Sequence, residues 1–248
     1  MLNNIQQLTS IFQSISLSEM ENVKLLDRMD SKFYFRIEKL EGIFSQLLNH
    51  YRLLEVKGIN FQRYESPYFD TQNFALYTQH QNGIQNRYKI RFRNYLDSQL
   101  CFFEIKHKNN KGRTLKHRIK TGEMKMDGKA EMFLIEKTPF TVAMLQKKIT
   151  VDYSRLTFVN TISCERVTLD LLLSCKNENA GIDFPELVIA EVKQDKSSLA
   201  SPFIKIMRQQ KINEGGISKY CLGIASLYPE VKNNLFKEQI ISLKKLIA

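Results

Sequence analysis

Several short segments of the chain carry basic side chains at every second position. The clearest is segment 87–95, in which Lys89, Arg91 and Arg93 alternate with Ile90 and Phe92. Residues two apart share one face of a β-strand, so this spacing predicts a strand with one charged and one apolar face. The same pattern recurs in five further groups: Arg28, Asp30 and Lys32; Glu104, Lys106 and Lys108; Lys116, Arg118 and Lys120; Arg166, Thr168 and Asp170; and Glu191 with Lys193.

The six charged faces together hold twelve basic and four acidic side chains. A sheet with one solvated face would explain any single strand. Solvated faces mix charges of both signs, however, and like charges on neighbouring strands destabilise a sheet. We therefore expect an anionic ligand to offset the repulsion. If the sheet closes into a barrel with these faces inward, its lumen becomes a cationic tunnel.

Side chains, rather than backbone amides, are expected to hold this ligand. Arg91, Arg93 and Arg166 can donate forked hydrogen bonds to phosphate oxygens, and lysine adds a movable point charge. The chain has neither a GxxxxGK[ST] loop nor a GxGxxG loop, the glycine-rich motifs that cradle phosphate at a helix N-terminus. The pattern indicates a phosphate-rich ligand bound by side chains.

The net charge of +11 suits a phosphate-rich molecule, nucleic acid or an acidic membrane surface. The basic residues recur within strands rather than along a helix, and neither an RNA-recognition motif nor a helix-turn-helix pattern is present. We therefore expect no nucleic-acid partner.

The cellular location is predicted from what the sequence lacks. The four cysteines are scattered without a CxxC pair, which favours a reducing compartment over a disulfide framework. No signal peptide and no apolar stretch of roughly 20 residues is found, so we expect a cytoplasmic chain without a transmembrane segment. The sequence does not identify a membrane-protein partner.

Hydrophobic periodicity predicts an α+β fold with a mainly antiparallel sheet in a single domain. The expected strands are 51–56, 61–69, 87–95, 100–108, 113–121, 158–172 and 187–193, with 28–36 also extended. The expected helices are 8–15, 16–26, 37–48, 202–210, 218–226 and 233–247. Asn82-Gly83 and the cluster 109–112 have the composition of turns.

Eight short motifs, taken in their order along the chain, carry a family resemblance. They are Arg28-Met-Asp-Ser-Lys32-Phe33, Tyr68-Phe-Asp-Thr71, Lys89-Ile-Arg91-Phe-Arg93, Glu104-Ile-Lys106-His-Lys108, Thr114-Leu-Lys116-His-Arg118, Glu165-Arg166-Val-Thr-Leu-Asp170, Glu191-Val-Lys193 and Ser218-Lys219-Tyr220. Together they resemble the VTC domain, a family of the triphosphate tunnel metalloenzymes, from about residue 16 to residue 226.

The resemblance implies a closed eight-stranded antiparallel β-barrel surrounded by helices. A single domain would then span 1–248, with an N-terminal helix in 1–27, the tunnel in 28–226 and a C-terminal helix in 233–247. Members of the family with polymerase activity transfer the γ-phosphate of ATP onto polyphosphate with a divalent metal, Mn²⁺ being implied and Mg²⁺ the alternative. The ligands expected for this chain are therefore ATP and polyphosphate.

The resemblance also assigns roles to individual residues. The catalytic positions that it implies are Lys32, Arg91, Arg93, Arg166 and Lys219. The resemblance also implies Lys106, Lys116 and Arg155 as phosphate-binding positions, and the charge pattern of the strands adds Arg28, Lys89, Lys108, Arg118 and Lys193. The resemblance implies Glu191 as the metal ligand, and we expect Glu104 or Asp170 to assist it.

Two alternative functions stay open. The first is a triphosphatase of the CYTH type, but such relatives begin with ExExK, whereas Arg28, Asp30 and Lys32 stand here. The second is a module that binds polyphosphate or inositol phosphates without turnover, because a fold and its site do not guarantee catalysis. Product analysis with ATP and Mn²⁺ would distinguish the three.

Overall fold

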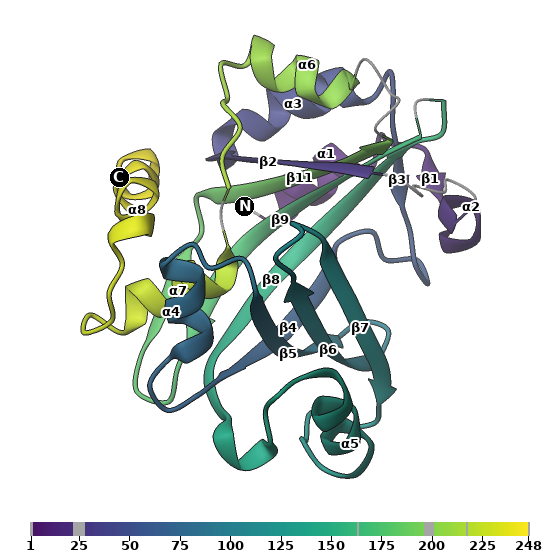
Figure 1. The fold of residues 1–248 in the computed structure, drawn as a ribbon. Coiled ribbons are helices and arrows are strands. Elements are labelled where there is room, and N and C mark those ends of the chain that lie inside the picture. The colour runs from purple at the N-terminus through teal and green to yellow at the C-terminus, as the bar shows by residue number, and fades with distance from the viewer. Residues whose placement is uncertain (1, 22–27, 163, 196–200, 217, 248) are drawn as a thin grey trace.

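The computed structural model describes residues 2–21, 28–162, 164–195, 201–216 and 218–247. Its centre is one large sheet with helices on both sides, which confirms the α+β class (Figure 1). Eight strands form the main path, and each pairs antiparallel with the next. Their order is β2 (Arg28–Arg36), β11 (Leu187–Asp195), β9 (Glu165–Lys176), β8 (Gln146–Asn160), β4 (Gln62–Asp70), β5 (Arg87–Tyr95), β6 (Leu100–Lys108) and β7 (Thr114–Thr121).

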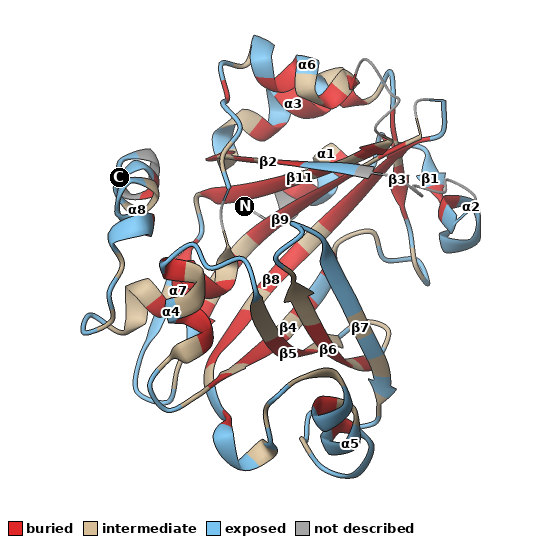
Figure 2. Ribbon diagram, viewed as in Figure 1, coloured by how far each residue is buried: buried red, intermediate tan, exposed pale blue. Residues whose placement is uncertain are grey.

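The expected closed barrel is not observed. Within the described residues no pairing joins β2 to β7, so these two strands are the edges of an open, curved sheet. Strand β7 is largely exposed, whereas the central strands are buried (Figure 2). The alternation of residues within a strand shows which side chains share a face, but it does not show whether the first and last strands of a sheet pair. The prediction of a closed barrel was wrong for this reason.

Three short strands lie off the main path. Strands β1 (Ser14–Ile15) and β3 (Arg52–Leu54) pair in parallel, and β3 also pairs with β8. Strand β10 (Gly181–Phe184) extends β9 as a hairpin. The segment 1–27, which we predicted to be helical, contains α1 (Leu2–Thr9), β1 and α2 (Leu17–Glu21). Residues 22–27 lie outside the described part of the chain.

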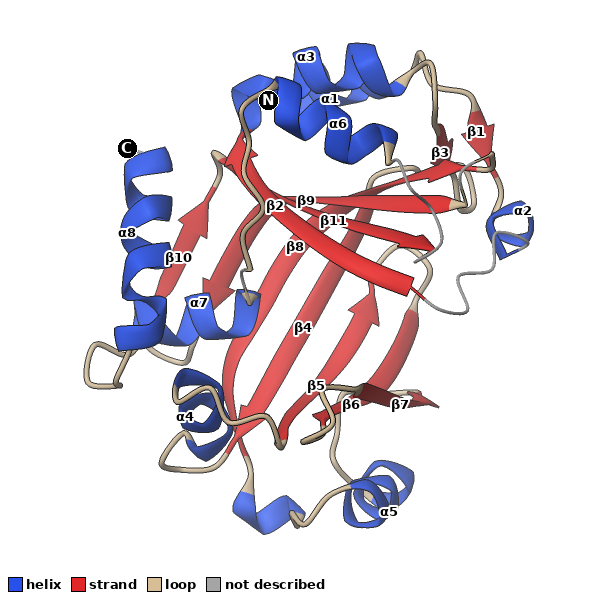
Figure 3. Ribbon diagram, turned by 45° about the horizontal axis from the view of Figure 1, so that its top comes forward, coloured by secondary structure: helices blue, strands red, loops and turns tan. Residues whose placement is uncertain are grey.

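Helices cover the outer, apolar side of the sheet in two places. Helices α1, α3 (Leu40–Leu47) and α6 (Pro202–Gln209) lie together over β2, β9 and β11 (Figure 3). The 3₁₀ turn η1 (Ile37–Lys39) leads into α3. Helix α5 (Gly128–Lys137), followed by the 3₁₀ turn η2 (Val142–Met144), covers β5 and β6 through Leu134, Ile90 and Phe103. Because the apolar side is buried against helices, the charged side chains face the interior of the curve.

A second group of helices fills one end of that interior. Helices α4 (Ala75–Gln81), α7 (Lys219–Leu227) and α8 (Asn234–Ile247) pack together there. Helix α7 lies directly against β8 at Gly223, where a Cβ atom would approach Ile149 Cδ1 to 2.6 Å. Glycine is therefore required for this close contact, which fixes the position of Lys219 at the start of α7.

The bounds of β5 and β6 agree with the sequence prediction, and β4, β7, β11 and the two C-terminal helices agree within two residues. The predicted strand 158–172 is wrong as a single element, because β8 ends at Asn160 and β9 begins at Glu165, with turn residues at 161, 162 and 164. Most of β8, together with β10, α4 and α5, was not predicted. None of the helices within the described residues has the length and apolar character needed to cross a membrane.

Candidate functional site

A basic pocket of about 110 Å³ lies on the inner face of the sheet. Seven cationic side chains and one carboxylate line it: Lys32, Lys89, Arg91, Arg93, Lys106, Arg155, Lys219 and Glu191. These residues come from β2, β5, β6, β8, β11 and the first residue of α7. Strands far apart in the sheet order thus line a single pocket, and every one of these eight residues was predicted as a site residue.

Glu104 on β6 holds the first group of cations together. Arg91 donates two hydrogen bonds to Glu104 Oε2, from Nε at 2.9 Å and from Nη2 at 2.6 Å. Lys116 Nζ lies 2.7 Å from Glu104 Oε1, and Arg93 Nε lies 3.9 Å from Oε2. Burial alone would raise the pKa of this fully buried carboxyl, but Arg91, Arg93 and Lys116 hold it well below its ordinary value. Glu104 is therefore an ionised counter-charge within the site.

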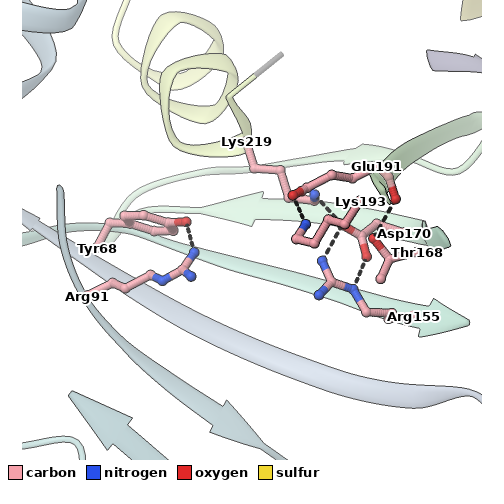
Figure 4. A network of polar contacts seen from close by, with 8 residues as sticks. All are labelled: Tyr68, Arg91, Arg155, Thr168, Asp170, Glu191, Lys193 and Lys219. Carbon is pink, nitrogen blue, oxygen red and sulfur yellow. Dashed lines mark hydrogen bonds and ion pairs between the residues drawn. The ribbon is translucent and has the colours of Figure 1, made fainter. Parts of the chain in front are cut away.

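Asp170 on β9 plays the same part for a second group of cations (Figure 4). Arg155 donates to both of its carboxylate oxygens, with Nη2 at 2.9 Å from Oδ2, and Lys219 Nζ also donates to Oδ2. The carboxyl is buried, which would raise its pKa, yet Arg155 and Lys219 hold the pKa well below the ordinary value. Asp170 thereby fixes a side chain of β8 and a side chain of α7 in one place.

Glu191 differs from both of these carboxylates. Its side chain is 27% exposed and lines the pocket, and the ion pair found for it within the described residues is with Lys193. The other two predicted metal ligands, Glu104 and Asp170, are occupied by arginine and lysine. No group of three or more His, Cys, Asp or Glu side chains suited to a metal occurs in the part of the chain that the structure describes. A cation held by Glu191 and by phosphate oxygens fits these contacts, whereas a cation held by all three carboxylates does not.

Four lysines around the pocket have lowered pKa values. Burial is the main cause for each of Lys32, Lys89, Lys106 and Lys116, and nearby cations add to it. The effect is largest at Lys106, whose pKa falls to about 6 because the side chain is buried beside Arg91, Arg93 and Lys116. The protonated state of these lysines is thus disfavoured in the protein alone, and a bound polyanion would favour it.

The prediction from sequence missed the aromatic and hydroxyl groups of the pocket. Tyr68, Tyr153 and Ser218 also line it, and Arg91 Nη1 donates to Tyr68 Oη at 2.5 Å. Ser218 caps α7 and accepts a hydrogen bond from Lys89 Nζ at 3.1 Å. Tyr68 shares a strand face with Tyr64 at period two, but tyrosine is as common in cores as in sites, so spacing alone did not single it out.

The motif that contains Tyr68 continues into a buried anchor. Asp70 Oδ1 accepts from the backbone N–H groups of Thr71 and Leu76, and Oδ2 accepts from Tyr77 N–H and Tyr220 Oη. The Tyr220 ring stacks on the Tyr68 ring at a centroid distance of 5.0 Å. Asp70 thus has a structural role: it joins the start of α4 to α7, the helix that carries Lys219.

The remaining predicted residues lie outside the basic pocket. Arg118 and Arg166 line a neighbouring pocket, together with Arg155. Lys108 lies at the end of β6, opposite Arg87 and Thr114, and lines neither pocket. Arg28 pairs with Asp195 in the register of β2 and β11, and its side chain lies outside the described part.

Comparison with known proteins identifies one matching family and several solved structures with a similar fold. The VTC domain family model matches residues 27–228. A candidate adenylate cyclase from Bacillus halodurans has a similar fold, with a TM-score of 0.53 and 16% identity, over 82% of this chain and 97% of that one. A candidate adenylyl cyclase from Hippeastrum, described as having a dominant triphosphatase activity, gives a TM-score of 0.54 and 11% identity, over 83% of this chain and 100% of that one. Identities this low show a shared fold alone, and no curated protein sequence matches the chain.

Proposed function

The chain belongs to the VTC domain family, and on that premise we propose that it is a phosphotransferase that moves the γ-phosphate of ATP onto a polyphosphate chain. A terminal oxygen of the acceptor chain bonds to the γ-phosphorus while the bond from that phosphorus to the β–γ bridging oxygen breaks. ADP leaves with the electron pair, and the acceptor becomes one phosphate longer. Atoms and charge balance without a covalent enzyme intermediate.

The surplus of positive charge in the basic pocket is the observation that supports this proposal. Seven cationic side chains line the pocket, against Glu191 in its wall and Glu104 and Asp170 behind it. With every basic side chain protonated, the formal surplus is four positive charges in a small volume, a state that a bound polyanion would favour. Phosphoryl transfer asks of a protein mainly positioning and charge neutralisation, and this arrangement suits both.

The cations divide into two groups according to their partners. Arg91, Arg155 and Lys219 are each paired with a buried carboxylate, which positions them before a ligand arrives. Arg91 and Arg155, together with Arg93, would bind the triphosphate through forked hydrogen bonds. Lys32 and Lys219 would stabilise the transferring group. Lys89 and Lys106 would hold the acceptor phosphates.

Glu191 is the residue that fits a divalent metal. Ions such as Mg²⁺ are often bound through one or two carboxylates, with substrate phosphates completing the coordination. When bound, Mn²⁺ or Mg²⁺ would be held by Glu191 and would reduce the negative charge of the phosphates. Because Glu104 and Asp170 are paired with cations, neither is free to activate water, which favours transfer over hydrolysis.

Product analysis with ATP, a short polyphosphate primer and Mn²⁺ tests the proposal. We expect the wild type to lengthen the primer and to release ADP in equal amount, and Glu191→Gln to lose the activity while it still binds polyphosphate. Orthophosphate as the only product would instead support a triphosphatase. Tight binding of polyphosphate without any product would overturn the transferase and leave a binding module.

A further inference from the structure

A second, larger pocket of about 410 Å³ continues the inner face of the sheet beyond the basic pocket. Arg155 lines both pockets, so they meet at this residue. The volume of the second pocket falls within the range of about 300–1,000 Å³ that is typical of small-molecule sites. Its walls differ in character from those of the basic pocket.

Aromatic side chains lead from one pocket into the other. The Tyr153 and Tyr64 rings stack at a centroid distance of 5.0 Å, Tyr64 and Tyr95 lie 4.9 Å apart, and Tyr95 and Phe102 lie 5.7 Å apart. Tyr95 follows Arg93 by two residues on β5, and Phe102 precedes Glu104 by two on β6, so both aromatics share the strand faces of the basic residues. The charged faces of these two strands therefore end in an aromatic surface.

The opposite wall of this second pocket is largely apolar. It is formed by Leu17, Met20 and Glu21 of α2 and by Leu54 at the end of β3. Leu17 is 45% exposed. The positive charge of this pocket comes from Arg155, Arg118 and Arg166, and the Arg118 guanidinium already lies 4.9 Å from the centroid of the Phe102 ring.

We propose that this second pocket binds the nucleoside of the nucleoside triphosphate, with the base between the Phe102–Tyr95 surface and the apolar side chains of α2. The inference rests on the proposed function, and it fixes the direction of the substrate. The triphosphate passes Arg155 and enters the basic pocket with its γ-phosphate foremost. Polyphosphate then approaches from the side of Lys89 and Lys106.

A continuation of the polyphosphate path is the competing explanation for the second pocket. Polyphosphate carries about one charge per residue along its whole length, and it needs cations rather than apolar walls to replace its water. The side chains of Leu17, Met20, Leu54 and Phe102 offer no hydrogen bond to phosphate. The second pocket has three arginines against the seven cations of the basic pocket, and its other walls are aromatic, apolar and neutral polar residues that include Gln62, Ser98 and Thr157. This mixture fits a base and ribose better than a run of phosphates.

Binding of ATP and of tripolyphosphate, measured side by side without turnover, tests the proposal. Both ligands place three phosphates in the basic pocket, but ATP alone offers a base. We expect the wild type to bind ATP more tightly than tripolyphosphate. Because base stacking on an aromatic ring contributes about 1–3 kcal/mol, Phe102→Ala is expected to weaken ATP binding about tenfold and to leave tripolyphosphate unchanged.

Two controls separate stacking from a structural effect. Phe102→Tyr keeps the ring and is expected to keep ATP affinity. Met132→Ala changes an exposed side chain on α5, far from both pockets in the fold, and is expected to change neither ligand.

Each other outcome overturns the inference in a recognisable way. Equal loss of ATP and tripolyphosphate in Phe102→Ala, or no loss of either, contradicts a nucleoside site while the phosphate site stands. Loss of long-chain polyphosphate binding as large as that of ATP would make the second pocket part of the polyphosphate path. A wild type that binds neither ATP nor tripolyphosphate removes the proposed function, and the nucleoside site with it.

Discussion

Arginines and lysines of the same basic pocket are held in opposite ways. Arg91 and Arg155 each donate to a buried carboxylate, and although burial would lower their pKa, Glu104 or Asp170 and neighbouring tyrosines raise it. We call these two arginines, with Glu104 and Asp170, the paired framework. Lys32, Lys89 and Lys106 form the lysine group, for which no ion pair is found in the described part of the chain and whose pKa values are lowered, mainly by burial.

The two groups of residues in this pocket are expected to contribute differently to the stability of the protein and to ligand binding. In the paired framework each buried cation has an anionic partner, so removing one member leaves an uncompensated buried charge and destabilises the protein. The lysine group destabilises the empty pocket and is expected to gain most from a polyanion. Mutations in the two groups should therefore change stability with opposite signs.

Neutralising Glu104 should have the largest effect. Glu104→Gln leaves Arg91, Arg93 and Lys116 without their shared counter-charge, and breaking a buried ion pair typically costs about 3–5 kcal/mol. We expect a loss of at least about 3 kcal/mol in the free energy of unfolding, measured by denaturant titration. Glu123→Gln, an exposed residue paired with Lys125, is the matched control and should change stability by under about 0.5 kcal/mol. Equal losses of stability in the two variants would contradict the role of Glu104 as the counter-charge of the buried cations.

Replacing a lysine of the lysine group by an apolar residue should raise the free energy of unfolding rather than lower it. Lys106→Met keeps the aliphatic length but removes a buried amine whose burial is unfavourable, so we expect stability to rise by about 1 kcal/mol. The same variant loses a charge-assisted contact to phosphate, and tripolyphosphate affinity should fall by about 2 kcal/mol, or roughly thirtyfold. Calorimetric binding and denaturant unfolding measure the two quantities. A variant that loses both stability and affinity would show that Lys106 belongs with the paired framework.

The pH dependence of phosphate binding should show whether Lys106 takes up a proton when the ligand binds. Lys106 has a pKa of about 6 in the protein alone, and bound phosphates raise it, so binding takes up a proton near pH 7.5. Affinity should then fall as the pH rises above about 6, by up to about tenfold per unit. Titrations in buffers of different ionisation enthalpy count the protons, and Lys106→Met should reduce the count by about one.

The linked effect on stability has the opposite sign. Because the pKa of Lys106 is about 6 when folded and near 10.5 as a free side chain, the folded protein holds fewer protons between these values. The contribution of Lys106 to stability therefore rises with pH across that window. Proton uptake that is identical in the wild type and in Lys106→Met would contradict the assignment.

Glu191 should give the smallest change in stability. Its partly exposed pair with Lys193 contributes little, so Glu191→Gln should alter the free energy of unfolding by at most about 0.5 kcal/mol. Removing its charge should leave metal-free binding of tripolyphosphate unchanged or tighter, and it should abolish any increase in affinity on adding Mn²⁺. A persisting metal effect in this variant would exclude Glu191 as the ligand.

The sequence predicts the inner face of the sheet well because strand periodicity is a local property. In β5 from Lys89 to Arg93 and in β6 from Phe103 to Lys106, charged and apolar residues alternate, and the strands are recognised from that alternation. Strand β8 was largely missed because its alternation changes phase: Ile149, Val151 and Tyr153 occupy every second position, and after a register shift between Asp152 and Ser154 the apolar residues stand at Leu156 and Phe158. A change of phase within a strand interrupts the period on which the prediction depends.

Properties that depend on distant contacts could not be predicted. Glu191 differs in role from Glu104 and Asp170 because different cations contact each carboxylate in the fold. In the sequence all three are acidic residues on alternating strands and cannot be told apart. The inner face is divided into two pockets at Arg155, which lines both, and the place of this side chain on the sheet is known only from the fold. Whether β2 and β7 pair depends on how the whole sheet curves, which no local pattern in the sequence reports.

Polyphosphate binding by charge-matched variants tests the central claim most directly. Lys32→Met with Lys89→Met removes two charges from the basic pocket, and Lys129→Met with Lys147→Met removes two from exposed positions. Since a hydrogen bond to a charged group contributes about 1.5–3 kcal/mol, the pocket pair should lose at least about a hundredfold in affinity, and the surface pair no more than about threefold. Equal losses in the two pairs would mean that polyphosphate binds to the overall charge of the protein, and the account would be contradicted.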